Sequence, residues 1–306
     1  MKYLIGIDGG GTATKICISD MDGQVVMRHR AGALNINGQN REAFQKTLSE
    51  ILETPGRMEL SAAECAGSGI GAAGVSNPQT YTLLKDAFQE KGYLAPLYAY
   101  SDGETALAAA FPDCPGIILI AGTGSICQGR TEDGAMVRAG GYGNLIDDGG
   151  SAYAIAIGIL SAVVRGEDGR GVKTILRDRV FEQWDIDGIG ELIGYLYQPG
   201  RTKKEIASLA VLLGEAVAAG DEAALAIERT CVDELSQMVL TVMKKLPKEK
   251  NVAFSGSVLL KNERIQSRVR DRIIGTRRDA CVLLADQDAS EGAVKLLMRE
   301  LRRHTV

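Results

Sequence analysis

The stretch that decides the fold is IGIDGGGTATK, residues 5–15, in which an apolar segment ends in an aspartate, three glycines and a threonine. At the end of a strand, glycines leave backbone N–H groups open to close approach by an anion, which favours a phosphate-binding turn. An ordinary glycine-rich hairpin turn would have the same composition. The rest of the chain has to decide between these two interpretations.

The same order of elements occurs again at residues 116–139. The segment GIILIAGTGSICQGRTEDGAMVRA predicts an apolar strand, a Gly-Thr-Gly-Ser turn, a strand, an Asp-Gly turn and a strand. TKICISDMDGQVVMRHR, which follows the first glycine turn, has the matching strand, Asp-Gly turn and strand. The turn threonine precedes the Asp-Gly glycine by 11 residues in both copies, from Thr12 to Gly23 and from Thr123 to Gly134. Matched order at matched spacing predicts a duplicated fold unit.

The remaining segments alternate between strands and helices and then become mainly helical. Between the two copies we expect strands at 68–74 and 94–100 and helices at 40–53, 78–92 and 104–111. After the second copy, we expect helices at 151–165, 172–182, 203–219 and 222–246, strands at 252–256 and 281–286, and a last helix from about 289. The pattern predicts an α/β protein in two halves, the second with extra helices.

Composition restricts the class of protein. The 306 residues suffice for two domains, and 45% hydrophobic with 24% charged residues is typical of a globular protein. The net charge of −4 does not favour a nucleic-acid partner. No apolar run reaches the roughly 18–20 residues that span a membrane, and the N-terminal segment does not resemble a signal peptide. We therefore expect a cytoplasmic protein that binds neither membrane nor nucleic acid.

Cysteine and histidine usage limits the chemistry. The six cysteines are dispersed without a C-x-x-C pair, which is typical of small core residues: Cys17, Cys65, Cys114, Cys127, Cys231 and Cys281. Only two histidines are present, so a histidine-rich zinc site and a Ser-His-Asp triad are not expected. Carboxylates, backbone amides and a hard metal ion remain as the means of catalysis.

Several glycine-rich segments together resemble a known family. Neither a P-loop nor a Rossmann glycine pattern is present. GIDGGGTATK, SDGETALAAAF, LIAGTGSI, GGYG, DDGGSAYAIA, SGSV and DASEGAVKLL resemble the actin / sugar kinase / heat-shock ATPase superfamily. More closely, they resemble the BadF/BadG/BcrA/BcrD ATPase family, and within it N-acetylglucosamine and glucosamine kinases. These segments extend from residue 5 to residue 297, so the resemblance covers the chain.

The resemblance implies a fold and a domain organisation. It implies two α/β domains of the ribonuclease-H-like (actin-like ATPase) type with an inter-domain cleft. The N-terminal domain would be residues 1–113, with the C-terminal helix 288–306 packing back on it. The C-terminal domain would be residues 114–287 and would carry the additional helices.

The resemblance also implies an ATP-dependent phosphoryl transfer, in which the protein mainly positions the reactants and neutralises charge. Asp8 would hold Mg²⁺ through water, because Mg²⁺ keeps part of its hydration shell. Lys15 could add charge, although a solvated strand lysine is the more ordinary interpretation. The residues implied in ATP binding are Gly10, Gly11, Thr12, Gly122, Thr123, Gly124, Ala207 and Gly256.

For the acceptor, the resemblance implies that Asp102 is the general base and faces a sugar hydroxyl. The residues alone would equally suit Asp102 as the N-cap of a helix that begins near Gly103. Tyr142 would form an aromatic wall or, alternatively, be a core residue. The residues implied in sugar binding are Asn35 (with Asn37 as the alternative), Asp102, Ser125, Gly141, Tyr142 and Asp148.

The expected reaction is phosphorylation of an amino sugar, with N-acetylglucosamine to N-acetylglucosamine 6-phosphate as the first candidate. Glucosamine and N-acetylmuramic acid are alternative acceptors. The chain has Gly149 where many relatives have glutamate, and this position borders the sugar. A less favoured function is the ATPase activator of a 2-hydroxyacyl-CoA dehydratase or benzoyl-CoA reductase, which requires paired cysteines. The resemblance also allows a homodimer.

Overall fold

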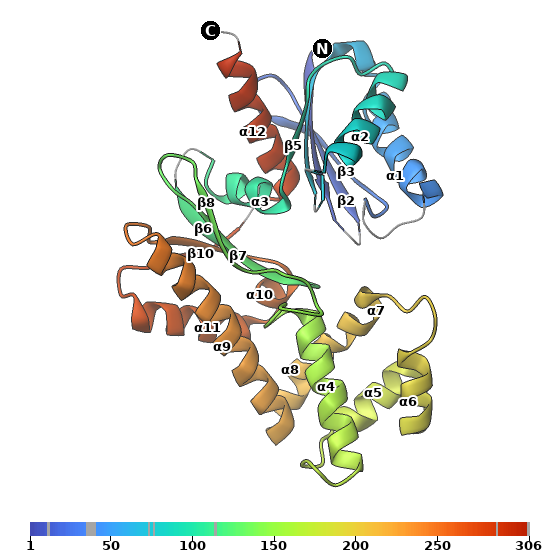
Figure 1. Cartoon of the computed structure of the whole chain (residues 1–306), viewed down its shortest axis with the longest axis vertical. Helices are drawn as coiled ribbons and strands as arrows, with labels where there is room; N and C mark the ends of the chain where they lie inside the picture. Colours follow the sequence, from blue (N-terminus) through green and yellow to red (C-terminus); the bar gives the residue numbers. More distant parts are fainter. Residues whose placement is uncertain are drawn as a thin grey trace. The chain divides into compact units, whose positions relative to one another are not determined.

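The computed structural model describes residues 1–10, 13–34, 41–72, 74–75, 77–112, 115–285 and 287–304. The chain divides into two compact units, each of which is described by itself (Figure 1). Unit 1 comprises Met1–Cys114 and Ala285–Val306, and unit 2 comprises Pro115–Leu284. In the part of the chain that the structure describes, no helix combines the length and the apolar character needed to cross a membrane.

Unit 1 is built on a five-stranded sheet with the order β3-β2-β1-β4-β5. The strands are β1 (Tyr3–Gly9), β2 (Thr14–Ser19), β3 (Val25–Ala31), β4 (Cys65–Ala72) and β5 (Leu97–Tyr100). The first three strands are antiparallel neighbours, whereas β4 and β5 run parallel to β1. Gly23 closes the β2–β3 turn with a φ of 83°, a conformation that favours glycine.

Helices cover both faces of this sheet (Figure 1). They are α1 (Arg41–Glu53), α2 (Pro78–Glu90), α3 (Asp102–Ala110) and α12 (Ala289–Arg303), with short 3₁₀ helices at Thr54–Met58 and Ala62–Glu64. On one face, Ile5 and Ile7 of β1 share a hydrophobic core with Phe44 and Leu48 of α1. On the other face, Leu4 and Cys17 pack against α12.

Glycines let α12 approach the sheet and α3 very closely. A Cβ on Gly6 would overlap the carbonyl group of Ser290, and one on Gly69 would lie 2.7 Å from the Ala293 carbonyl oxygen. A Cβ on Gly292 would overlap the Thr105 carbonyl oxygen and lie 2.7 Å from the Ala109 nitrogen. The last helix of the chain is therefore a structural part of unit 1.

Unit 2 repeats the sheet, with the order β10-β9-β6-β7-β8. The strands are β6 (Gly116–Ala121), β7 (Ser125–Arg130), β8 (Met136–Gly140), β9 (Asn251–Ser255) and β10 (Cys281–Leu284). Three antiparallel strands are again followed by two parallel ones. Gly134 closes the β7–β8 turn with a φ of 89°, as Gly23 does in unit 1. The predicted duplication and the predicted α/β fold class are confirmed.

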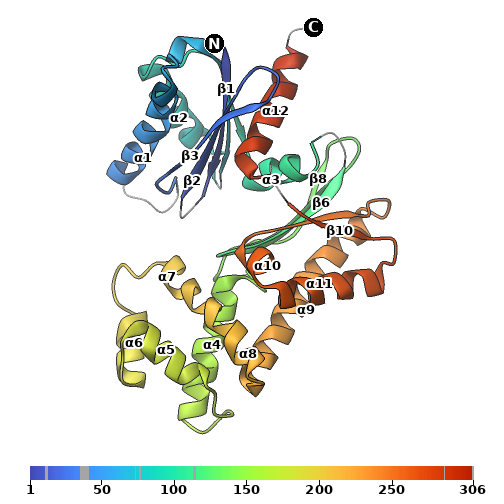
Figure 2. The same ribbon diagram turned by 180° about the vertical axis from the view of Figure 1, so that it is seen from behind.

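Most of the helices of unit 2 come between β8 and β9 in the sequence (Figure 2). They are α4 (Ala152–Glu167), α5 (Leu176–Trp184), α6 (Ile189–Leu196), α7 (Lys203–Ala207), α8 (Leu212–Ala218) and α9 (Glu222–Lys245), with a 3₁₀ helix at Ser208–Val211. Two more helices, α10 (Ser257–Lys261) and α11 (Glu263–Thr276), come between β9 and β10. Their apolar residues and the sheet form one extended core.

Some local expectations need correction. The single helix expected at 203–219 consists of α7, a 3₁₀ turn and α8, and the helices α6, α10 and α11 were not predicted. Cys17, Cys65, Cys127 and Cys231 are buried as expected, but Cys281 is exposed at the start of β10. An edge strand presents side chains to solvent, which explains that exception. Cys114 lies outside the described residues.

Candidate active site

At the β1–β2 turn of unit 1, neighbouring atoms leave no room for side chains at Gly9 and Gly10. A Cβ on Gly9 would lie 2.9 Å from the Ala72 Cβ atom, and one on Gly10 would lie 2.7 Å from the Ala13 carbonyl oxygen. The Gly10 nitrogen donates to the Ala13 carbonyl at 3.2 Å, which closes the turn. The predicted ATP-binding residues Gly11 and Thr12 lie outside the described residues. The described backbone explains why this turn requires glycine.

Asp8, the predicted metal residue, lies at the end of β1 opposite Lys15 of β2. The pKa of Asp8 is raised from 3.8 to about 6, mainly because the carboxyl group is buried; the charge of Lys15 opposes the shift, and the charges of Asp288 and Asp102 add to it. Lys15 is exposed on its strand, as the ordinary interpretation predicted. A positive charge at this place would stabilise the ionised form of Asp8. Among the described residues, no group of three or more His, Cys, Asp or Glu side chains could hold a metal ion.

Asp102 is free of the capping role that its sequence position suggested. Helix α3 begins at Asp102, and its N-cap is Ser101, whose Oγ accepts from the Glu104 nitrogen at 3.2 Å. The Glu104 carboxylate in turn accepts from the Ser101 nitrogen at 2.8 Å, which completes a capping box. The Asp102 carboxylate is exposed and accepts from the adjacent Gly103 nitrogen at 2.9 Å. The N-cap interpretation of Asp102 is therefore wrong.

Asp288 is a site residue that the sequence analysis did not single out. It is the N-cap of α12 and accepts from the Ser290 nitrogen at 3.0 Å. Its charge acts on Asp8, although 280 residues separate the two in the chain. In the sequence, the DASEGA segment that contains Asp288 contributes only to the family resemblance.

The β6–β7 turn of unit 2 comprises Gly122, Thr123 and Gly124. The Gly122 nitrogen donates to the Gly124 carbonyl at 2.8 Å, and the Gly122 carbonyl accepts from the Ala152 nitrogen at the start of α4, also at 2.8 Å. A Cβ on Gly122 would meet no atom within 4 Å. This glycine therefore has open space beside it, as a ligand-binding turn requires.

Next to this turn, the structure brings together two predicted sugar-binding residues. The Ser125 nitrogen donates to Asp148 Oδ1 at 3.5 Å, and the Ser125 hydroxyl donates to the Gly149 carbonyl at 2.6 Å. Asp148 is buried and forms an ion pair with Lys203, the first residue of α7. Lys203 is another residue that the sequence analysis missed, because 55 residues separate it from Asp148.

The loop that follows β8 carries the remaining predicted sugar residues. Gly140 and Gly141 have φ values of 71° and 75°, so both positions favour glycine. Tyr142 is 57% exposed, which rules out the core alternative. The Arg138 guanidinium lies 4.3 Å from the centre of the Tyr142 ring and donates to the Gly141 carbonyl at 2.8 Å. Asn35 and its alternative Asn37 lie outside the described residues.

Position 149, where the family resemblance implies glutamate, lies beside an acidic side chain. A Cβ there would lie 2.7 Å from the Glu234 carboxylate on α9. A glutamate at 149 would bring a second carboxylate to the same place, and like charges repel. Glycine at 149 avoids this repulsion.

A cavity of about 990 Å³ lies within unit 2 beside the β6–β7 turn. Thr123 and Ala207, both predicted to bind ATP, line it together with Ser257, which follows Gly256. Gly256 has a φ of 88°, and a Cβ there would overlap the backbone of Ala121. The cavity wall contains polar, aromatic and charged residues that the sequence did not reveal: Gln183, Trp184, Tyr195, Lys204, Glu205, Ser208, Lys261 and Asn262. The volume and the mixed lining suit a nucleotide base with its ribose.

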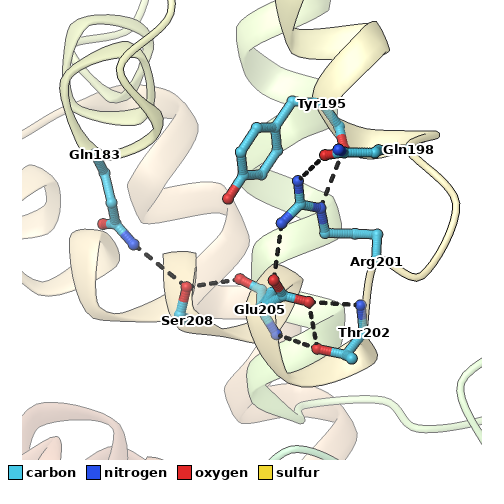
Figure 3. A network of polar contacts seen from close by, with 7 residues as sticks. All are labelled: Gln183, Tyr195, Gln198, Arg201, Thr202, Glu205 and Ser208. Atoms are coloured by element: carbon cyan, nitrogen blue, oxygen red, sulfur yellow. Dashed lines mark hydrogen bonds and ion pairs between the residues drawn. The ribbon is translucent and has the colours of Figure 1, made fainter.

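A polar network holds one wall of this cavity (Figure 3). Arg201 donates to Glu205 at 2.8 Å, to Gln198 at 2.7 Å and to the Tyr195 carbonyl at 3.1 Å, and its guanidinium lies 3.6 Å from the Tyr195 ring centre. The Gln183 side chain reaches Ser208 at 3.3 Å. The network connects α5, α6 and α7, so side-chain hydrogen bonds hold the helices of this wall together in addition to the backbone that joins them.

Comparison with known proteins shows the family of this chain. The model of the BadF/BadG/BcrA/BcrD ATPase family matches residues 5–287. The chain belongs to the BadF/BadG/BcrA/BcrD ATPase family. The glycine turns at the ends of β1 and β6 both lie within the matched range.

Relatives within and around this family are named as amino-sugar kinases. The chain is 38% identical over 247 residues to an N-acetylmuramic acid/N-acetylglucosamine kinase of Clostridium acetobutylicum, covering 80% of this chain and 81% of that protein. It is 27% identical over 314 residues to an N-acetyl-D-glucosamine kinase of Dictyostelium discoideum, covering 97% and 98%. A solved structure from Chromobacterium violaceum, provisionally named an N-acetylglucosamine kinase, matches with a TM-score of 0.78 and 27% identity, covering 97% of this chain and 99% of that one.

Proposed function

We propose that this protein is an amino-sugar kinase that transfers the γ-phosphoryl group of ATP to a hydroxyl group of the sugar. N-acetylglucosamine, converted to N-acetylglucosamine 6-phosphate, is the first candidate. Membership of an ATPase family supports the use of ATP, and the names of the relatives support an amino-sugar acceptor. The observation that carries the proposal is the exposed Asp102 carboxylate, which the Ser101 cap leaves free for chemistry.

Asp102 is the general base in this proposal. It lies directly after β5, a strand parallel to β1 and β4, and ligands of open α/β sheets bind beyond the carboxyl ends of parallel strands. Its carboxylate would accept the proton of the attacking hydroxyl, which contributes about 10²–10⁴ in rate. Asp102 is the first residue of α3, a position where the helix dipole favours negatively charged side chains.

The two glycine turns are proposed to bind the phosphates. Gly10, Gly11 and Thr12 belong to the first turn, and Gly122, Thr123 and Gly124 to the second. Backbone N–H groups and threonine hydroxyls are suitable donors to phosphate oxygens. The base and ribose would enter the 990 Å³ cavity of unit 2, with Ala207 and Gly256 on its border. We propose that units 1 and 2 correspond to the two actin-like ATPase domains, 1–113 with 288–306 and 114–287.

Magnesium is proposed as the cofactor, and the environment of Asp8 fits a cation. The Asp8 carboxylate is partly buried, and its neighbours Asp102 and Asp288 are also acidic. Mg²⁺ binds through one or two carboxylates and the substrate phosphates and keeps several waters, so it needs no larger cluster of protein ligands. Such an ion neutralises charge on the transferred phosphoryl group.

For the sugar, we propose Ser125, Gly141, Tyr142 and Asp148, together with Asn35. A pyranose offers paired hydroxyl donors and acceptors that short carboxylate and amide groups can meet, and the exposed Tyr142 ring offers an apolar face. Glucosamine and N-acetylmuramic acid remain alternative acceptors. The dehydratase-activator function is not favoured, because it requires paired cysteines. Among the described cysteines, Cys281 is exposed, whereas Cys17, Cys65, Cys127 and Cys231 are buried.

A coupled ADP-release assay tests the proposal. The protein would be assayed with MgATP and N-acetylglucosamine, glucosamine, N-acetylmuramic acid or glucose, and the hydrolysis without sugar would be subtracted. We expect sugar-dependent ADP release for at least one amino sugar, and the position of the phosphate would be established by NMR of the product. ATP hydrolysis that no amino sugar stimulates would overturn the proposal.

A further inference from the structure

The starting observation is a buried carboxylate beside the second glycine turn. The Asp148 side chain is 6% exposed, and its Oδ1 accepts from the Ser125 nitrogen at 3.5 Å. A Cβ on Gly124 would lie 3.2 and 3.3 Å from the two Asp148 carboxylate oxygens. The negative charge of Asp148 therefore lies directly against the turn that is proposed to bind the anionic phosphates.

Lys203 compensates this charge. Its ammonium group forms an ion pair with Asp148 Oδ2, and the lysine side chain is 33% exposed. On another side, the ammonium lies 5.6 Å from the centre of the Tyr153 ring on α4, a distance at which a cation is attracted by the ring face. Lys203 is thus held between an acidic and an aromatic group.

The start of α7 places Lys203 accurately. Thr202 is the N-cap, and its Oγ1 accepts from the Glu205 nitrogen at 3.3 Å, while Glu205 accepts from the Thr202 nitrogen at 2.7 Å. Arg201 binds the other oxygen of Glu205 at 2.8 Å (Figure 3). The same short helix contributes Lys204, Glu205 and Ala207 to the cavity wall. The ion pair therefore joins the proposed sugar residue Asp148 to the wall of the proposed nucleotide cavity.

The opposite charges of Asp148 and Lys203 indicate a function for this ion pair. A buried carboxylate without a partner is costly, and its field in a low-dielectric surrounding extends to neighbouring ligands. An uncompensated Asp148 would repel a polyanionic triphosphate from the Gly122–Gly124 turn. The adjacent ammonium group of Lys203 cancels this repulsion and leaves a carboxylate oxygen of Asp148 as an acceptor for sugar hydroxyls.

We infer that Lys203 is a positioning residue with two effects: it balances the charge of Asp148, so that the glycine turn accepts the triphosphate, and it holds the Asp148 carboxylate in place as an acceptor for the sugar. This inference rests on the proposed amino-sugar kinase function. Lys203, the first lysine of the Thr202-Lys203-Lys204-Glu205 segment, would then affect the binding of both ATP and the sugar. Neither the composition nor the spacing of the sequence indicates this role.

A charge-compensation cycle tests the inference. Lys203→Met, Asp148→Asn and the double variant would be compared with the wild type, and Lys248→Met, an exposed lysine that follows α9, is the matched control. The dissociation constant of AMPPNP with Mg²⁺ would be measured by calorimetry, and the KM for the sugar by ADP release. Thermal melting would establish that each variant is folded.

We expect the AMPPNP affinities to follow the net charge at the turn. Lys203→Met should bind about tenfold more weakly than the wild type, Asp148→Asn about tenfold more tightly, and the double variant within about threefold of the wild type. The KM for the sugar should rise about tenfold or more in all three variants. Lys248→Met should change neither constant.

The outcomes separate the inference from the function on which it rests. A double variant that binds AMPPNP as weakly as Lys203→Met would overturn charge compensation, because a merely structural role of Lys203 predicts no rescue. If Lys203→Met does not fold, Asp148→Asn must still bind AMPPNP more tightly than the double variant, and equal affinities overturn the inference. A wild type that binds AMPPNP but phosphorylates no amino sugar overturns the proposed function and, with it, the sugar half of the inference.

Discussion

Units 1 and 2 contain the same five-stranded sheet, but different helices surround it. In unit 1, α12 and α3 lie so close to the sheet and to each other that Gly6, Gly69 and Gly292 have no room for a side chain. In unit 2, the helices inserted between β8 and β9 pack through aliphatic and aromatic residues and leave a cavity of about 990 Å³. In unit 1 the carboxylate of Asp288 at the start of α12 acts on Asp8, whereas the helices inserted in unit 2 leave room for a ligand.

Both units contain the duplicated glycine turn, but the charged side chains next to the turn differ between them. The β1–β2 turn lies next to Asp8, whose acidic neighbours are Asp102 and Asp288. The β6–β7 turn lies next to Asp148, whose charge Lys203 balances. One turn thus has an excess of negative charge that suits a cation, and the other has a neutral ion pair. Four predictions test this difference, from the largest expected effect to the smallest.

Asp102→Asn should lower the rate of phosphoryl transfer at least about 100-fold, because an amide cannot accept the proton of the hydroxyl. AMPPNP affinity should change little, since nucleotide binding is assigned to other residues. Initial rates of ADP release with saturating sugar provide the measurement. Asp86→Asn, an exposed aspartate on α2, is the control and should be fully active. Near-normal turnover of Asp102→Asn would remove Asp102 from the mechanism.

Gly292→Ala should lower the free energy of unfolding by about 3 kcal/mol, because the new methyl group would overlap the Thr105 carbonyl oxygen in the tightly packed unit 1. Gly194→Ala, at a helical glycine of unit 2 with no atom within 4 Å of the new Cβ, should raise it by about 0.5–1 kcal/mol. Chemical denaturation measures both. Equal effects of the two substitutions would contradict the difference in packing.

Ala207→Leu should raise the KM for ATP about tenfold by filling part of the cavity in unit 2. The kcat should change by less than about threefold, because Ala207 is assigned to ATP binding and not to the chemistry. Ala218→Leu, an exposed position on α8, serves as the control for the added side chain. An unchanged KM for ATP in Ala207→Leu would mean that the nucleotide does not occupy this cavity.

Asp8→Asn should stabilise the protein at neutral pH in the absence of Mg²⁺. The folded-state pKa of Asp8 is raised from 3.8 to about 6, so ionisation of Asp8 costs stability as the pH rises through this range, and the full cost is present above pH 6. The variant should gain about 1–2 kcal/mol at pH 7.5, less than 1.36 kcal/mol per pKa unit would give, since solvent screens part of the charge.

The gain of Asp8→Asn should disappear as the pH falls towards 4, where the wild-type carboxyl group is also neutral in the folded state. Thermal melting curves between pH 4 and pH 8 would measure it, and MgAMPPNP should narrow the difference between the two proteins at pH 7.5. A stability difference that does not depend on pH would show that Asp8 is not the source.

Much of the fold follows from local patterns. The two glycine turns, their Asp-Gly partners and the 11-residue spacing predicted the duplicated sheet, because alternating apolar strands and tight turns are encoded by neighbouring residues. The helices at 78–90, 222–245 and 289–303 agree with their expected positions to within a few residues. Helix α3 begins two residues earlier than expected, because the Ser101–Glu104 capping box includes Asp102 in the helix.

The sequence did not predict the interruption of the helix at Ser208–Val211. Residues 203–219 have a continuous helical pattern, but the chain forms a 3₁₀ turn between α7 and α8 where it borders the cavity. Ser208 bonds back to the Glu205 carbonyl at 2.6 Å in this turn, a local alternative to regular helix. Helix propensity averaged over neighbouring residues cannot detect a change from α-helix to 3₁₀ helix, since the tertiary environment selects between these two similar backbone conformations.

The amino-acid sequence by itself determined the sheet duplication, the glycine turns and the membership of an ATPase family, because each is recognised from short motifs of neighbouring residues. Only the tertiary structure decided that Asp102 is not a cap, that Asp8 has a raised pKa, and that Lys203 pairs with Asp148 beside the second turn. The raised pKa and the ion pair arise from burial and from charges on distant segments. Electrostatic energy depends on distance in space and on the exclusion of water, and neither quantity can be obtained from spacing along the chain.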